Sequence, residues 1–406
     1  QNLLFPPSLP NGTYWLEFPA QTYNTNMRAF MLNALQQADR TNMYLIFSPF
    51  DTFSFDEAFA TEFPWSTNNG GPLTDINNFF QTDAVLDLAK ARMAQLFTWL
   101  NESAFKPYAH RLIGWEILNE WDSYEWTLNS EGNSEAGRET EMRRRAQFVT
   151  ALADYTKAQD PRRLTLNSTI AQDPRGPLAR ADFYSRSFDA AVPHLYTNSS
   201  EEPINNPDSD TSIRPAIENA SITSYWMTHA EHRRPIINAE WGMTRTDWPG
   251  GVPAYSSEFT QAEDEAIFRT MMWSGLASGQ AGMGLRITTD ELTSNGNLLT
   301  SNMRSLQKTF ANFITSSTLQ LDYTNFNFRT LNSRLTATGT INAVADQSLL
   351  SWGVSDGSQG VLYILKDSRV EAGDVTSGLV TITGLRADQV IDIEIWSTAA
   401  GTSAAT

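Results

Sequence analysis

The sequence predicts an α/β protein, a (β/α)₈ TIM barrel followed by a C-terminal β-sandwich domain. From about residue 44 to residue 315, short apolar runs alternate with longer segments of helical periodicity, which is typical of a parallel sheet covered by helices. After about residue 317 the helical periodicity ends, and short alternating runs with turn signals follow. We therefore expect a barrel domain over residues 1–316 and a sandwich domain over residues 317–406.

Each predicted element has the periodicity of its class. The predicted strands are short and apolar, and they cover residues 44–50, 111–118, 163–168, 189–195, 235–240 and 281–287. The predicted helices cover residues 25–40, 84–104, 137–159, 211–230, 261–278 and 301–315, and residues 84–104 carry apolar side chains at helical spacing. A barrel of this class needs eight strands. We therefore expect its N-terminal part to be incomplete in this chain, with residues 13–18 as a short strand or part of a long loop.

Charge and composition narrow the classes of partner. The formal net charge is −17, from 46 acidic and 29 basic residues, which argues against nucleic acid and against anionic membrane surfaces. No apolar run reaches the length of about 18 residues expected of a transmembrane helix. The chain has no cysteine, which excludes disulfides and thiolate metal sites. Its histidines are scattered and it lacks a dinucleotide or phosphate fingerprint, so we expect neither a metal nor a cofactor.

Polar side chains gather where the predicted strands end, which is the face at which parallel barrels hold their active sites. The run WEILNE ends on an amide and a carboxylate, Asn119 and Glu120, and PIINAE ends on a second carboxylate, Glu240. The other candidates for substrate contact stand at or directly after strand ends, and they are Asp51, Trp121, His194, Tyr196, Trp241 and Arg286. Tryptophan rings suit stacking on sugars, although core packing is an alternative for each.

Two glutamates on separate strand ends indicate glycoside hydrolysis. One carboxylic acid protonates the leaving oxygen, while the other attacks the anomeric carbon or activates a water molecule. The distance between the two carboxyl groups decides between retention and inversion of configuration.

The motifs WEILNEW and INAEWG resemble the strand-4 and strand-7 signatures of glycoside hydrolase clan A, closest to family 5, the cellulase- and mannanase-like retaining (β/α)₈ enzymes. This resemblance implies that Glu120 is the general acid/base and Glu240 the nucleophile. It implies that Asn119 binds the sugar 2-hydroxyl. His194 and Tyr196, spaced H-x-Y, match the strand-6 pair of family 5. The strand-2 arginine and strand-8 tryptophan of that family are not recognisable here.

We expect a retaining enzyme that cleaves β-linked glucan- or mannan-type polysaccharide or oligosaccharide, in endo or exo fashion. We expect it to be secreted or extracellular, although the chain shows no signal peptide. Two alternatives remain open. One is a catalytically inactive carbohydrate-binding protein, and the other is a transglycosylase that uses the same glutamates.

Overall fold

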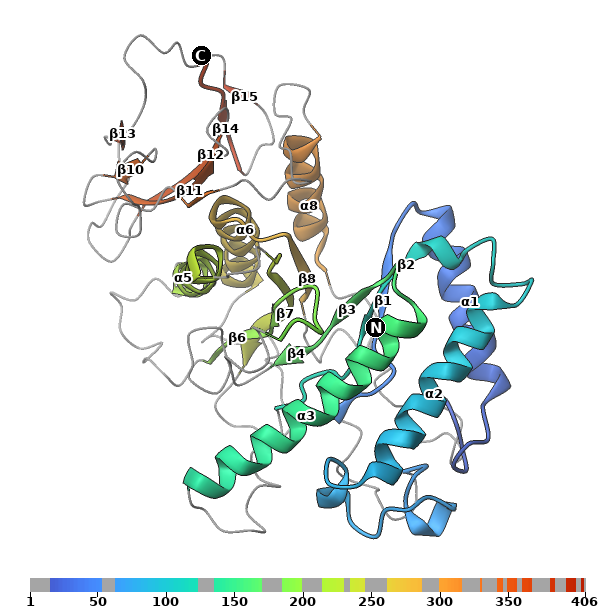
Figure 1. Cartoon of the computed structure of the whole chain (residues 1–406). Coiled ribbons are helices and arrows are strands. Elements are labelled where there is room, and N and C mark those ends of the chain that lie inside the picture. Colours follow the sequence, from blue (N-terminus) through green and yellow to red (C-terminus); the bar gives the residue numbers. More distant parts are fainter. Residues whose placement is uncertain are drawn as a thin grey trace. The chain divides into compact units, whose positions relative to one another are not determined.

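The computed structural model describes residues 15–52, 63–122, 135–169, 185–198, 214–229, 234–244, 261–286, 299–315, 329–330, 342–345, 349–355, 360–366, 380–383, 392–398 and 403–404. The chain forms two compact units, Gln1–His194 and Leu195–Thr406, and Figure 1 labels their helices and strands. None of the described helices is long and apolar enough to cross a membrane.

The first unit is built on parallel strands. Strands β1 (Leu45–Phe47), β2 (Leu112–Glu116) and β3 (Leu164–Leu166) form one sheet in chain order, and β4 (Ser168–Thr169) pairs with β5 (Val192–Pro193). Neighbours in the sheet are also neighbours in the sequence. This order is the one that a barrel requires, whereas a doubly wound sheet reverses its order part-way.

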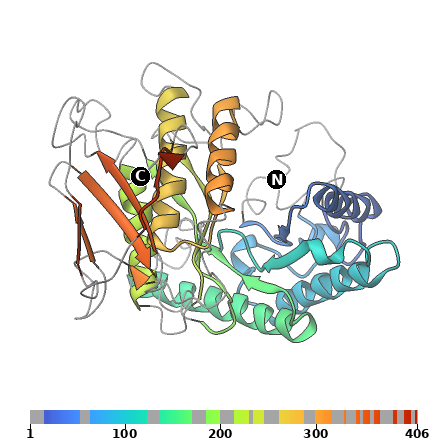
Figure 2. The ribbon, with the colours of Figure 1, turned by 90° about the horizontal axis from the view of Figure 1, so that it is seen from above.

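Three helices complete this unit, α1 (Thr25–Arg40), α2 (Asp83–Asn101) and α3 (Glu135–Gln159). Short 3₁₀ helices η2 (Thr67–Asn69), η3 (Ile76–Asn78) and η4 (Ala109–Arg111) lie in the connections. Helix α2 lies against α3, and α3 lies against β3 (Figure 1, and from above in Figure 2). The buried residues of α2 recur at helical spacing and include Val85, Ala89, Met93, Leu96 and Leu100. This face supplies much of the core of the unit.

The second unit begins with another parallel sheet, in the order β6 (Leu195–Asn198), β7 (Ile237–Thr244) and β8 (Gly282–Arg286). Its helices are α5 (Arg214–His229), α6 (Gln261–Ser278) and α8 (Ser301–Ile314). Helix α6 is buried along most of its length, and α5 and α8 both lie against it. An apolar helix with few exposed positions is expected where neighbours cover it on several sides.

The C-terminal strands of the second unit are antiparallel where they pair. They are β9 (Arg329–Thr330), β10 (Asn342–Ala345), β11 (Leu349–Ser355), β12 (Gly360–Lys366), β13 (Val380–Thr383), β14 (Ile395–Trp396) and β15 (Ser403–Ala404). They form the ladders β12-β11-β9, β10-β13 and β14-β15. Trp352 and Tyr363 stack with ring centroids 5.9 Å apart, and Tyr363 stacks on Trp273 of α6 at 6.4 Å. The central ladder is therefore packed onto a helix.

Most predicted elements are confirmed, with shifts of a few residues at their ends. The predicted strands 163–168 and 189–195 differ, because the structure breaks the first at Asn167 into β3 and β4 and the second at His194 into β5 and β6. The predicted strand 235–240 runs on as β7 to Thr244, since β6 pairs with residues 241–244 and lengthens the ladder. Residues 15–18 do not form a strand of the sheet, and Glu17 makes only an isolated antiparallel bridge to Tyr23.

The larger architecture is confirmed in part. The parallel α/β pattern is present in both units, but the described strands do not close into a complete barrel. The antiparallel ladders after residue 317 agree with the predicted β content, yet they do not show two sheets packed face to face. The sandwich and the boundary at residue 316 therefore stay predictions.

A buried ion pair fastens the segment before α1 to helix α2. The Arg92 guanidinium donates from Nε to Glu17 Oε1 at 2.9 Å and from Nη1 to the Pro49 carbonyl at 3.2 Å. It lies over the Phe50 and Trp65 rings, 4.7 and 4.4 Å from their centroids. The Trp65 indole Nε1 donates to Glu17 Oε1 at 2.6 Å. Each of the two buried charges is thus compensated by the other and by further hydrogen bonds from the protein.

We predict that Arg92→Met lowers the free energy of unfolding by about 3–5 kcal/mol, because it leaves the Glu17 carboxylate buried without its counter-charge. Urea unfolding followed by tryptophan fluorescence measures this change. The control is Arg28→Met, which breaks the more exposed pair between Arg28 and Glu102 and is expected to cost much less. Equal losses in the two variants would contradict the prediction.

Candidate active site

The end of β2 lies between the ends of its two neighbours. Hydrogen bonding continues beyond the strand, because the Ile117 N–H donates to the Leu166 carbonyl at 2.8 Å and the Asn119 N–H donates to the Phe50 carbonyl at 3.0 Å. Asp51 and Asn119 form a parallel bridge. Trp115, Ile117 and Leu118 are buried, whereas Ile113 near the start of β2 is exposed. Asn119 and Glu120 therefore follow the carboxyl end of a mostly buried strand, as the sequence predicts.

Glu120 has a backbone conformation that is unusual for its residue type. Its φ is +50°, in the left-handed region that residues with a Cβ rarely adopt. The Glu120 N–H donates to Ser168 Oγ at 2.9 Å, and its carbonyl accepts from Thr52 Oγ1 at 2.9 Å. Non-glycine residues in this region persist only where their surroundings hold them, and such residues are concentrated at functional sites.

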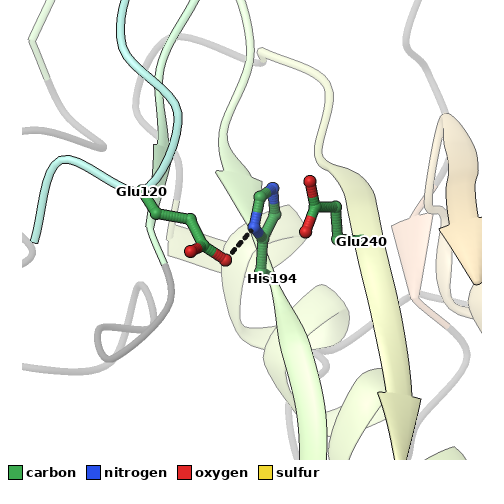
Figure 3. A group of neighbouring side chains, drawn as sticks. All are labelled: Glu120, His194 and Glu240. Carbon is green, nitrogen blue, oxygen red and sulfur yellow. Dashed lines mark hydrogen bonds and ion pairs between the residues drawn. The ribbon is translucent and has the colours of Figure 1, made fainter. Parts of the chain in front are cut away.

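His194 contacts the Glu120 carboxylate directly. Its ring Nδ1 lies 2.8 Å from Glu120 Oε1, and Figure 3 shows this contact as a dashed line. The His194 N–H donates to the Thr169 carbonyl at 2.7 Å, which anchors the residue beside β4. The two side chains are buried, with Glu120 7% and His194 3% exposed. Such a carboxylate–imidazole pair can orient a proton-transfer group. A carboxylate oxygen and an imidazole nitrogen are also of the kinds that bind metal ions, and Glu120 and His194 offer one each.

The amide of Asn119 is fixed from both sides. Its Nδ2 donates to Asp51 Oδ1 at 3.2 Å, and its Oδ1 accepts from Ser168 Oγ at 3.2 Å. These two contacts agree on one orientation of the amide. The hydrogen bond from Asn119 gives Asp51 a structural role at the end of β2. A direct sugar contact by Asp51 stays a prediction.

Two of the candidate tryptophans are packed in cores. Trp121 and Trp241 are each 1% exposed. The backbone N–H of Trp121 donates to the Ser168 carbonyl at 3.3 Å, and the backbone carbonyl of Trp121 accepts from Arg145 Nη1 at 3.2 Å. The Trp241 ring packs against Phe268 at a centroid distance of 5.4 Å. These surroundings are those of the packing alternative, and sugar stacking by either ring stays a prediction.

The remaining candidates belong to the sheet of the second unit. Glu240 is half-buried on β7 and lies in register with Leu285 on β8; its side chain is drawn in Figure 3. Tyr196 on β6 lies in register with Gly242, and Arg286 on β8 with Trp241. The structure describes the backbones of Tyr196 and Arg286 but not their side chains, so their predicted contacts lie outside the described residues.

Sequence analysis missed Thr52 and Ser168. Both hydroxyls are buried and bonded to the Asn119–Glu120 segment. A signal exists for Ser168, because LTLNST places small hydroxyl residues at the end of an otherwise apolar strand. For Thr52 the sequence offers only its place directly after a strand end.

Solved structures similar to this chain include several glycosidases. An exo-β-1,4-mannosidase from an Opitutaceae bacterium has 15% identity and a TM-score of 0.44 over 68% of this chain and 44% of that protein. A rutinosidase from Aspergillus niger has 14% identity and a TM-score of 0.40 over 68% of this chain and 69% of that protein. A β-glucuronidase from an uncultured Clostridium has 13% identity and a TM-score of 0.36 over 64% of this chain and 40% of that protein.

This chain thus spans less than half of the mannosidase and of the β-glucuronidase. Further matches are GH5_18 proteins from Bifidobacterium longum and Streptomyces cattleya, with TM-scores of 0.45 and 0.42. Identities and TM-scores this low concern the fold and carry no functional argument. None of the protein-family models and none of the curated proteins matches the chain.

We predict that Glu120→Gly is more stable than Glu120→Ala by about 1–2 kcal/mol, because glycine adopts a positive φ without the steric cost of a Cβ. Both variants remove the carboxylate, so their difference isolates the backbone term. Urea unfolding of the two variants measures it.

The matched control is the same pair of changes at Glu116, within the regular strand β2. There the order should be reversed, with glycine less stable than alanine by about 0.5–1 kcal/mol. Alanine more stable than glycine at position 120 as well as at 116 would contradict a left-handed Glu120.

Proposed function

We propose that this protein is a retaining β-glycoside hydrolase, with Glu120 as general acid/base and Glu240 as nucleophile. The observation that supports it most is the state of Glu120. This buried glutamate follows the end of a parallel strand, has a strained backbone held by hydrogen bonds, and faces a histidine. A structural carboxylate does not need that combination. The separate strand-borne glutamate, Glu240, supplies the second carboxyl group that the chemistry requires.

The reaction has two steps. Glu240 attacks the anomeric carbon, and the bond from that carbon to the glycosidic oxygen breaks while Glu120 gives its proton to the departing oxygen. The product is a glycosyl ester on Glu240. Glu120, now a carboxylate, takes a proton from water, whose oxygen attacks the anomeric carbon and releases Glu240. Two inversions leave the configuration retained.

The neighbours of Glu120 have defined roles in this scheme. His194, at 2.8 Å from Glu120 Oε1, holds the carboxyl group in one rotamer during both proton transfers. Asn119 has its amide oriented by Asp51 and Ser168, and we assign it to the sugar 2-hydroxyl by its resemblance to family 5. The substrate class is a β-linked glucan- or mannan-type saccharide. The similar structures are named for different sugars, so a panel of aryl glycosides has to identify the sugar.

We predict that Glu120→Ala lowers kcat/KM for an unactivated aryl β-glycoside by about 10²–10⁴-fold, the usual contribution of a proton-transfer group. Glu240→Ala removes the nucleophile and should lower it at least as much. For Glu120→Ala the loss should be smaller with a 2,4-dinitrophenyl glycoside, because that leaving group departs without a proton. For Glu240→Ala it should be severe with both substrates.

The control for these variants is Glu116→Ala, which removes a strand glutamate bonded to Ser48 and should keep most of the activity. Circular dichroism must show that all three variants are folded. Full activity in either Glu120→Ala or Glu240→Ala would refute the assignment. A folded wild-type protein that binds the sugar but releases no aglycone would instead be the inactive carbohydrate-binding protein.

We predict that the first product has the β configuration. ¹H NMR of the anomeric protons during early hydrolysis distinguishes it from the α anomer before mutarotation. An α product would mean inversion, and hence a water molecule between carboxyl groups about 6.5–9.5 Å apart. If added acceptor sugars capture most of the glycosyl groups in preference to water, the enzyme is a transglycosylase.

A further inference from the structure

Two buried hydroxyl groups hold the Asn119–Glu120 segment from opposite sides. Ser168 comes from β4, and Thr52 follows the end of β1, so the two residues flank the end of β2. Both are fully buried. We call Thr52 and Ser168 the hydroxyl clamp.

Ser168 binds three consecutive residues. Its Oγ accepts from the Glu120 N–H at 2.9 Å and donates to Asn119 Oδ1 at 3.2 Å, and its carbonyl accepts from the Trp121 N–H at 3.3 Å. A single hydroxyl can accept one bond and donate another at the same time. It therefore ties the orientation of the Asn119 amide to the position of the Glu120 backbone.

Thr52 holds the carbonyl side of the same segment. Its Oγ1 donates to the Glu120 carbonyl at 2.9 Å and lies 3.2 Å from the Asn119 carbonyl. Its own N–H donates to the Asn119 carbonyl at 3.4 Å. The N–H and the C=O of Glu120 are thus each bonded to a buried hydroxyl, and these two bonds oppose the relaxation of φ away from +50°.

A change in φ at Glu120 moves the carboxylate. The Cβ leaves the backbone in a direction set by φ, so rotation toward the ordinary region would carry Oε1 away from His194 Nδ1, now 2.8 Å distant. Proton transfer depends steeply on such placement. We propose that the hydroxyl clamp positions the general acid/base, so that Thr52 and Ser168 are positioning residues of the proposed glycosidase. This inference rests on the proposed function.

The test compares variants that lose a hydroxyl with matched variants that do not disturb the clamp. Ser168→Ala and Thr52→Val each remove one clamp hydroxyl, and Thr52→Ser keeps the hydroxyl while losing the methyl group. Thr165→Val is the second control. Thr165 lies on β3, three residues before Ser168, and it is also fully buried. Within the described residues its hydroxyl has no hydrogen-bond partner, so its loss should not disturb the clamp.

The readout is kcat/KM for a phenyl and a 2,4-dinitrophenyl β-glycoside of the sugar that the panel identifies. Ser168→Ala and Thr52→Val should lose about 10- to 100-fold on the phenyl glycoside. They should lose several times less on the dinitrophenyl glycoside, whose departure needs no proton. Thr52→Ser and Thr165→Val should stay near the wild type on both substrates. General damage to the fold would lower both rates together.

Each outcome decides one of the two proposals. Two results would contradict the positioning role of the clamp without contradicting the proposed function. One is an equal loss of kcat/KM on the phenyl and dinitrophenyl glycosides. The other is a ratio of these two kcat/KM values that stays at the wild-type level in both Ser168→Ala and Thr52→Val. If Ser168→Ala does not fold, the contrast between Thr52→Val and Thr52→Ser still decides. A wild-type protein inactive on every glycoside would overturn the proposed function, and the clamp's catalytic role with it.

Discussion

The left-handed backbone of Glu120 is the constraint on which the geometry of the first unit's site depends. A glutamate does not adopt this conformation by preference, so the surrounding chain has to supply the stabilisation. It does so with two hydroxyls and with the pairing of β2 to its neighbours on both sides. The order of strands in the parallel sheet is therefore a condition of this geometry as well as of the core.

The hydrogen bonds around Glu120 also compensate several polar side chains that are buried. Asn119, Glu120, Ser168 and His194 are all buried. Each has a hydrogen bond to another member of the group or to the strand ends around it. In a medium of low polarity such bonds are stronger than in water, and a missing one costs more. The network is consequently more rigid than any of its single contacts.

Sequence alone predicted the elements well and the site in part. The helix periodicity of residues 84–104 and the apolar run before Asn119 come from local spacing, which the printed sequence carries directly. The break at His194 was not predicted, because an apolar run does not reveal that one half pairs with β4 and the other half with β7. Thr52 and Ser168 were missed for a related reason. Their contacts depend on the cross-strand register, which the sequence does not give. A positive φ at Glu120 cannot be predicted either, because glutamate rarely adopts it.

The Glu17–Arg92 pair has a consequence for how this sequence can diverge. Either residue alone is hard to replace, since its partner would keep a buried charge. Lysine cannot take the place of Arg92, because it lacks the planar group that lies over Phe50 and Trp65 while bonding Glu17. A related sequence that folds in the same way would have to replace both residues together by apolar ones. We therefore expect substitutions at positions 17 and 92 to be rare and to occur in pairs.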